Sequence, residues 1–103
     1  MFFFMAGCQA AEPEIARGLP PGYAEANAAF DQRIKQRFPV GTSEKRIVRE
    51  LEAQSFVVKS HPGWKEASFT KSHIATETVW SVRWTASDSI VRKRWGLCFG
   101  RGL

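Results

Sequence analysis

Cys8 is the residue whose surroundings most clearly suggest a chemistry. It ends a short apolar run with two small residues just before the cysteine, Met1-Phe2-Phe3-Phe4-Met5-Ala6-Gly7-Cys8, and the chain then becomes polar and rich in proline. This order is typical of the end of a bacterial lipoprotein signal, so we predict that Cys8 is lipidated and becomes the mature N-terminus. A signal also needs a positive segment before its apolar run. The first Lys or Arg here is Arg17, so we expect the true start upstream and interpret residues 1–8 as a signal remnant.

The bonding state predicted for the second cysteine, Cys98, depends on that of Cys8, because the chain has only these two cysteines. If Cys8 carries a lipid, an intrachain disulfide is impossible. Cys98 is then either a buried inert thiol or the partner of a cysteine in another chain. Free cysteine is among the most buried residue types, and we therefore predict a buried thiol.

Other catalytic or ligand-binding patterns are not evident. The two histidines, His61 and His73, belong to no cluster with the ligand spacing of a zinc site. The chain also lacks the G-x-S-x-G motif of hydrolases and the glycine-rich loops that hold phosphate. We predict no metal site, no cofactor and no enzymatic activity.

Length and composition limit the fold and the partners. A chain of 103 residues holds one domain, and its eight Phe, four Trp and one Tyr provide a small aromatic core. Fifteen Lys and Arg against ten Asp and Glu give a net charge of +5, which suits anionic lipid, an acidic protein or nucleic acid. No apolar run reaches the 18 residues or so of a membrane-spanning helix.

The first half of the chain is predicted to hold a tether and two helices. Residues 9–22 contain three prolines and no apolar periodicity, so we expect a partly extended tether. A helix is predicted from Tyr23 to Phe38 by apolar residues spaced three and four apart, and Pro39 ends it. Thr42 is the expected N-cap of a second helix that runs to about Gln54.

The second half has the pattern of β-strands. Short strands are expected at residues 56–59, 67–74, 78–86 and 90–99, with turns at His61-Pro62-Gly63 and Ser87-Asp88-Ser89 and a flexible tail formed by residues 96–102. Two helices followed by such strands predict an α+β fold. In it, two N-terminal helices pack on a three- to four-stranded antiparallel sheet as a two-layer sandwich.

The last hairpin suggests a register. Pairing Thr85 with Ile90 gathers Trp80, Trp84 and Trp95 on the face that the helices cover, where we expect them to be core. Basic residues then gather on the other face, where Arg83 lies across from Arg92 and Arg94 lies near Ser81. This face is either an ordinary solvated surface or a docking surface for an anion or a protein.

Three short motifs, taken together with the element order, resemble a known family. They are Met5-Ala6-Gly7-Cys8, Phe38-Pro39-Val40-Gly41-Thr42-Ser43 leading into Ile47 and Leu51, and Trp80-Ser81-Val82-Arg83-Trp84. The chain over residues 23–103 is similar to the small outer-membrane-assembly lipoproteins of the BamE/SmpA-like group. The resemblance implies a non-enzymatic, lipid-anchored module that faces the periplasm and contacts envelope proteins or anionic lipid. Gln9 follows the cysteine where an inner-membrane retention signal prefers Asp, so we expect the outer membrane.

Two functions therefore remain open. The first is an interaction module that supports envelope structure or outer-membrane assembly, with Arg83, Arg92 and Arg94 as the partner- or anion-binding residues. The second is an inhibitor or immunity lipoprotein that blocks a toxin or an envelope hydrolase. In that case Trp64, beside the His-Pro-Gly turn, is the expected interface anchor. Nucleic acid is not an expected partner, because the tryptophans are needed for the core. The oligomeric state stays open.

Overall fold

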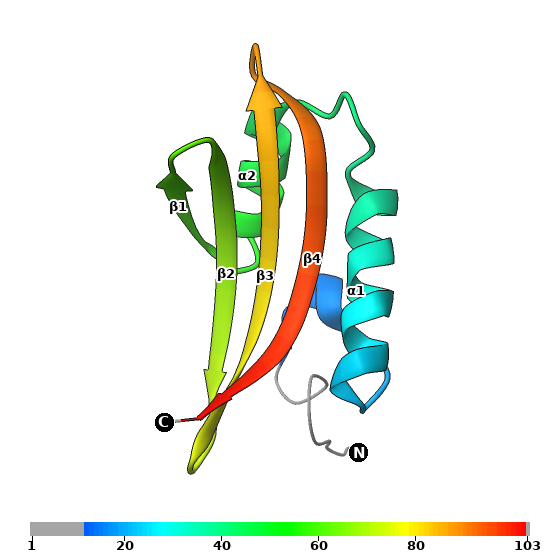
Figure 1. The fold of residues 1–103 in the computed structure, drawn as a ribbon, viewed down its shortest axis with the longest axis vertical. Coiled ribbons are helices and arrows are strands. Elements are labelled where there is room, and N and C mark those ends of the chain that lie inside the picture. The colour runs from blue at the N-terminus through cyan, green and yellow to red at the C-terminus, as the bar shows by residue number, and fades with distance from the viewer. Residues whose placement is uncertain (1–11, 103) are drawn as a thin grey trace.

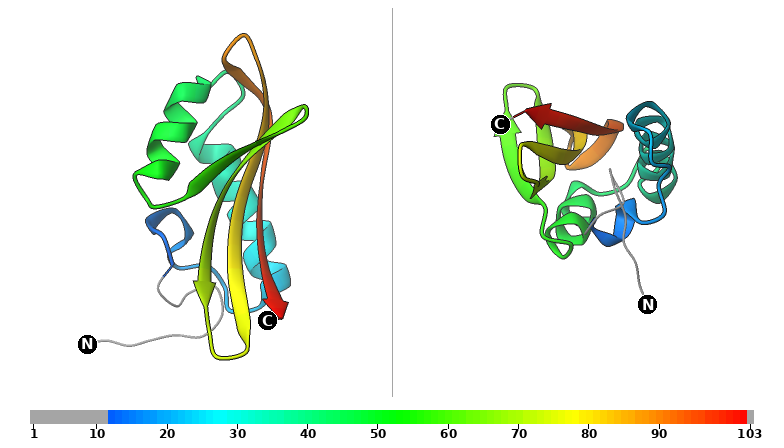
Figure 2. Two further views of the ribbon diagram at one scale, coloured as in Figure 1. Left: turned by 90° about the vertical axis from the view of Figure 1, so that its left-hand side faces the viewer. Right: turned by 90° about the horizontal axis from the view of Figure 1, so that it is seen from below.

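The computed structural model describes residues 12–102, which form an α+β two-layer sandwich. One layer is a four-stranded antiparallel sheet in the order β1-β2-β3-β4, and the other contains the helices, which all lie on one side of the sheet (Figures 1 and 2). The predicted fold class is therefore confirmed. The elements are η2 (Glu14–Ala16), α1 (Tyr23–Arg37), α2 (Glu44–Glu52), β1 (Val57–His61), β2 (Trp64–Ser72), β3 (Thr76–Ser87) and β4 (Ile90–Gly102).

The helices follow the predicted apolar spacing. In α1, Ala26, Phe30 and Ile34 are buried, and Phe38, just after its last residue, is buried as well. In α2, Ile47 and Leu51 form the buried stripe. The N-cap is Ser43 and not Thr42, because the Ser43 hydroxyl accepts a hydrogen bond of 3.1 Å from the backbone N–H of Arg46.

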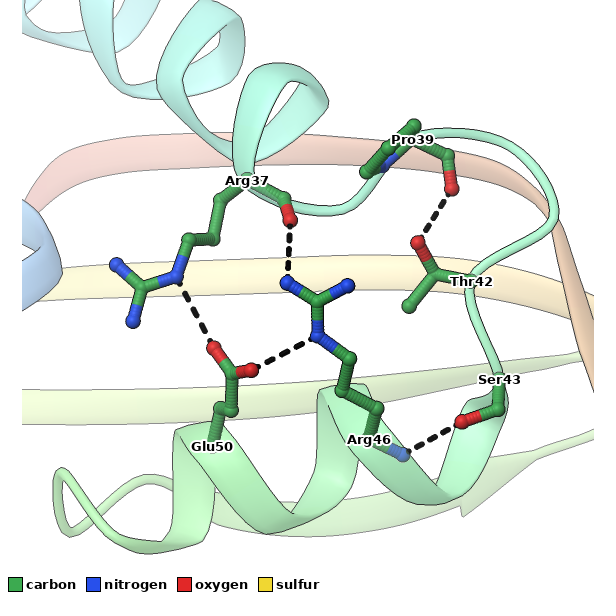
Figure 3. A network of polar contacts seen from close by, with 6 residues as sticks. All are labelled: Arg37, Pro39, Thr42, Ser43, Arg46 and Glu50. Carbon is green, nitrogen blue, oxygen red and sulfur yellow. Dashed lines mark hydrogen bonds and ion pairs between the residues drawn. The ribbon is translucent and has the colours of Figure 1, made fainter.

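A polar network fixes the corner between the two helices (Figure 3). Glu50 accepts hydrogen bonds from Arg37 on α1 at 3.0 Å and from Arg46 on α2 at 2.8 Å. Arg46 also donates to the backbone oxygen of Arg37, and the Thr42 hydroxyl donates to the backbone oxygen of Pro39. One carboxylate thus holds the end of α1 against α2.

The segment before α1 does not form the predicted tether. Residues Ile15, Ala16 and Leu19 are at most 2% exposed and belong to the hydrophobic core. The short helix η2 lies between α1 and α2 in the view from below (Figure 2), and Gln54 accepts a hydrogen bond from the N–H of Ile15. The prediction is wrong for residues 12–19, because two helices alone leave part of this small core uncovered.

The predicted register of the last hairpin is also wrong. Asp88 and Ser89 both have positive φ and form a two-residue turn that pairs Ser87 with Ile90. Such a turn matches the natural twist of the strands. A bulge then leaves Arg92 without a cross-strand partner, so that Thr85 pairs with Lys93 and the later residues of β4 change faces.

The bulge is explained by the close packing of β4 against α1. It directs Gly96 and Cys98 toward the helices, and a Cβ atom at Gly96 would lie 2.8 Å from Ile34 Cγ1 and 3.0 Å from Phe30 Cδ2. A tryptophan at this inward position would not fit beneath α1. Residues 96–102 are consequently part of β4, and the predicted flexible tail is wrong.

The outer edge of β4 is covered by α1, which runs beside it (Figure 1). The Asp31 side chain accepts a hydrogen bond of 3.0 Å from the N–H of Gly96, and Asn27 accepts one of 2.9 Å from the N–H of Cys98. Arg94 donates to the backbone oxygen of Phe38 at 2.8 Å, which satisfies a carbonyl at the end of α1. The contacts of Asp31 and Asn27 occupy backbone N–H groups of β4 that would otherwise allow another strand to pair with this edge.

Candidate functional site: the outer face of the sheet

The face of the sheet that carries no helix, called here the outer face, has an apolar stretch along β4. On β4 it presents Trp95, Leu97 and Phe99, which are all half-buried, and Val79 lies directly opposite Phe99 on β3. The exposed side of an antiparallel sheet is normally polar. A continuous apolar stripe at this position favours a binding surface.

The three arginines of the predicted site do not share this face. Arg83 lies on the outer face, opposite Trp95. Arg94 pairs with the buried Trp84, and its side chain extends on the helix side to α1. Arg92 is exposed at the bulge. The prediction that these three arginines form a cluster is therefore wrong. It depended on a register of the last hairpin that the bulge changes.

Trp64 lies where the β1–β2 turn joins β2, and it is neither fully exposed nor buried. Its ring stacks on His61 with centroids 4.0 Å apart, and the guanidinium carbon of Arg83 lies 5.3 Å from its centroid. Both contacts fix the indole on the outer face. The tight turn at Pro62 and Gly63 allows this placement, because Gly63 adopts a positive φ of 84°.

A pocket of about 260 Å³ opens on the outer face, and we call it the tryptophan pocket. Trp64 and Trp95 come to it from β2 and β4, and Arg83 lies on the strand between them. Its remaining lining residues are Pro62, Gly63 and Thr85. The pocket therefore combines two indoles with one guanidinium, the residue types that most often dominate binding energy at interfaces.

A carboxylate network borders the pocket. Glu66 accepts a hydrogen bond of 2.6 Å from Ser81 and one of 3.3 Å from Arg83 Nε, and its other oxygen lies 3.4 Å from His61 Nε2. Burial alone would raise the pKa of Glu66, but the hydrogen bond from Ser81, the charge of Arg83 and the contact with His61 outweigh it, so the pKa lies below its usual value.

This network contains the residue types of a hydrolase triad in an order that does not activate a nucleophile. The carboxylate of Glu66 lies between Ser81 and His61, so the imidazole is not placed to accept the serine proton. Ser81 is also fully buried. The arrangement holds Arg83 in position, and it offers no route for nucleophilic attack.

A larger, open hollow lies beside α2 and holds no comparable arrangement. Its apolar lining residues are Val48, Ala53 and Ile90, and five charged side chains surround them. Among these, Glu44 is already paired with the Lys65 ammonium at 2.9 Å and accepts the indole N–H of Trp84 at 2.9 Å. The Lys65 ion pair and the Trp84 hydrogen bond outweigh the effect of burial and lower the pKa of Glu44.

Residues 12–102 show no group of three His, Cys, Asp or Glu side chains placed to hold a metal ion. His73 lies near the β2–β3 turn, where its ring contacts the Thr78 hydroxyl at 3.0 Å. In the same part of the chain, no helix is long and apolar enough to cross a bilayer.

Cys8 lies outside the described residues, so its predicted lipidation is not addressed by the geometry. Cys98 is 2% exposed and disulfide-bonded, and the expectation of a free thiol there is wrong. A sulfur that carries a lipid cannot also form a disulfide. Lipidation of Cys8 therefore requires that the disulfide of Cys98 lead to another chain, because the sequence has only two cysteines.

Several residues of the outer face were missed by sequence reasoning. Trp95, Leu97 and Phe99 alternate with Gly96 and Cys98, and this alternation was the available signal. It indicates two well-separated faces, but it does not say which face meets the helices. Glu66 carried no local signal, because its partners come from β1 and β3.

Comparisons of the chain with protein-family models, with curated proteins and with solved structures find no match.

Proposed function

We propose that this protein is a non-enzymatic interaction module of the cell envelope that binds a protein partner through the outer face of its sheet. The observation that carries the proposal is the apolar stripe of Trp95, Leu97 and Phe99 beside the tryptophan pocket. The helices cover the other face and the edge of β4, whereas Trp95, Leu97 and Phe99 stay partly exposed on the outer face.

The proposal places the module on the periplasmic side of the outer membrane, with Cys8 as the lipid anchor. The lipoprotein-like order of residues 5–8 and the resemblance to BamE/SmpA-like proteins support this location. With Cys8 as the anchor, the disulfide of Cys98 must join a cysteine of another chain, and such a disulfide supports an oxidising compartment such as the periplasm. Support of envelope structure or of outer-membrane assembly is the role that fits such a module.

Site-specific photocrosslinking in cells tests the proposed surface. A photoreactive amino acid at Leu97 on the outer face should form adducts with an envelope protein, whereas the same group at Gln36, exposed on α1, should not. Adducts from Gln36 alone, or from neither position, would contradict the proposal. Mass spectrometry of the N-terminal peptide and fractionation of the membranes test the anchor separately.

Inhibition of a toxin or an envelope hydrolase is the second candidate. Two exposed hairpin tips favour it: the β1–β2 turn next to Trp64, and the β2–β3 turn, where Ile74 is fully exposed. Protruding tips of this kind suit insertion into an enzyme cleft. Crosslinks from Ile74 to a hydrolase or toxin, in the absence of crosslinks from Leu97, would favour this function.

A further inference from the structure

We infer that the tryptophan pocket is a subsite for a carboxylate carried by an acidic peptide segment of a protein partner. The inference rests on the proposed function, because it names the chemistry that the outer face would recognise. Three features support it: the donors left on Arg83, the balance of charge around the pocket, and the pocket's walls and size.

Arg83 is held in place while part of its hydrogen-bonding capacity stays unused. Its Nε atom donates to Glu66 and to Ser81, and its guanidinium carbon lies over the Trp64 ring. The two Nη atoms make no hydrogen bond to any of the described residues, and the side chain is 30% exposed. A guanidinium fixed in this way offers two parallel donors, which match the two oxygens of a carboxylate at little further entropic cost.

The charge around the pocket favours an anion. Lys59 lies opposite Glu66 on the outer face, and Lys93 lies opposite Thr85, which lines the pocket. Neither lysine has an ion pair within residues 12–102, so with Arg83 they give three cations against the single carboxylate of Glu66. A second copy of the chain would bring the same cations together, so charge complementarity favours an acidic partner over self-association.

The size and the walls of the pocket suit one side chain. A volume of about 260 Å³ lies below the range of pockets for drug-sized ligands. The indoles of Trp64 and Trp95 can contact the methylene groups of a glutamate whose carboxylate meets Arg83. Leu97 and Phe99 continue the apolar surface along β4, which would accommodate apolar residues next to the acidic one.

Nuclear magnetic resonance titration of the full ¹⁵N-labelled chain tests the inference. The probe is a capped hexapeptide with two glutamates beside a phenylalanine, and the control peptide has both glutamates replaced by glutamines. We expect shifts of the indole N–H signals of Trp64 and Trp95, and affinity for the control peptide weaker by about tenfold. Equal affinity for the two peptides would overturn the inference.

Matched variants separate recognition by Arg83 from general charge. Arg83→Gln should weaken binding of the acidic peptide by about tenfold. Arg101→Gln should leave it nearly unchanged, although Arg101 also pairs with a glutamate on the outer face, Glu77 at 2.7 Å. If Arg83→Gln does not fold, Arg83→Lys keeps the charge opposite Glu66 and loses the planar donor pair, so it should still weaken binding several-fold.

The remaining outcomes are also decisive. Binding to phosphatidylglycerol vesicles without binding to the peptide would overturn the inference in favour of a lipid surface. A crosslink from Leu97 that persists in cells with Arg83→Gln would overturn the carboxylate subsite while leaving the proposed function intact. Loss of that crosslink in Arg83→Gln, but not in Arg101→Gln, would support both.

Discussion

Arg83 and Trp95 lie directly opposite each other on β3 and β4, on the face of the sheet that carries no helix. The bulge at Arg92 produces this pairing, because without it the side chain of Trp95 would point toward the helices. The cross-strand pair places an indole beside a guanidinium that Trp64 contacts from the other side. Two tryptophans that are 31 residues apart in the sequence therefore border one pocket.

The different environments of two tryptophans predict different costs of substitution. Trp84 is fully buried and its indole N–H donates to Glu44 at 2.9 Å, so Trp84→Phe should lower the free energy of unfolding by about 2–3 kcal/mol. Trp95 is half-buried on the outer face, so Trp95→Phe should cost less than about 1 kcal/mol. Urea unfolding of both variants checks this. Equal costs would contradict the outward placement of Trp95.

Gly96 should not tolerate a side chain. A Cβ atom there would meet Ile34 Cγ1 at 2.8 Å and the Phe30 backbone oxygen at 3.2 Å, so Gly96→Ala should destabilise the protein by about 1–3 kcal/mol. Gly102→Ala is the matched control, because no atom lies within 4 Å of the place that its new methyl group would take. Thermal or urea unfolding of the two variants provides the comparison, and a neutral Gly96→Ala would mean that α1 does not pack this closely on β4.

The hydrogen bonds that α1 side chains make to the edge of β4 should slow hydrogen exchange of the β4 amides. Asn27→Ala removes the acceptor for the N–H of Cys98, so that amide should exchange faster, and stability should fall by about 1–2 kcal/mol. Gln32→Ala, at an exposed position on the same helix, should change neither quantity measurably. Hydrogen–deuterium exchange followed by NMR measures both. Unchanged exchange at Cys98 in Asn27→Ala would contradict this contact.

Glu66 should contribute to the loss of folding stability at low pH. Its pKa is lowered from the ordinary value of 4.5 in the folded protein, so its contribution to stability is fully present above that value and is lost as the pH falls through the folded pKa. Glu66→Gln should therefore flatten the loss of stability below about pH 4.5. The pKa values of Glu44 and Glu50 are lowered too, so part of the slope should remain. Urea midpoints measured from about pH 3 to pH 7, with exposed Glu52→Gln as the control, test this.

The sequence was sufficient for the elements because their signals are local. The apolar spacing of α1, the stop at Pro39 and the alternation around Trp80 and Trp84 each lie within one segment, and the structure has elements at all three places. The pairing of β3 with β4 could not be predicted in the same way. It depends on a bulge whose reason is the close approach of Gly96 to α1, more than 60 residues away. The prediction of the site was wrong for the same reason. The bulge places Trp95 on the outer face and Arg94 on the helix side of the sheet.

The disulfide partner of Cys98 gives the sharpest test of the proposed lipid anchor at Cys8. Because Cys98 is disulfide-bonded, it should resist alkylation in the unfolded, unreduced protein and react once a reductant is added. Mass spectrometry of unreduced digests then identifies the peptide joined to it, with Cys98→Ser as the control. A partner in another chain is compatible with lipid on Cys8. A link to Cys8 itself would exclude the anchor, since one sulfur cannot carry both bonds, while leaving the outer face and its proposed partner untouched.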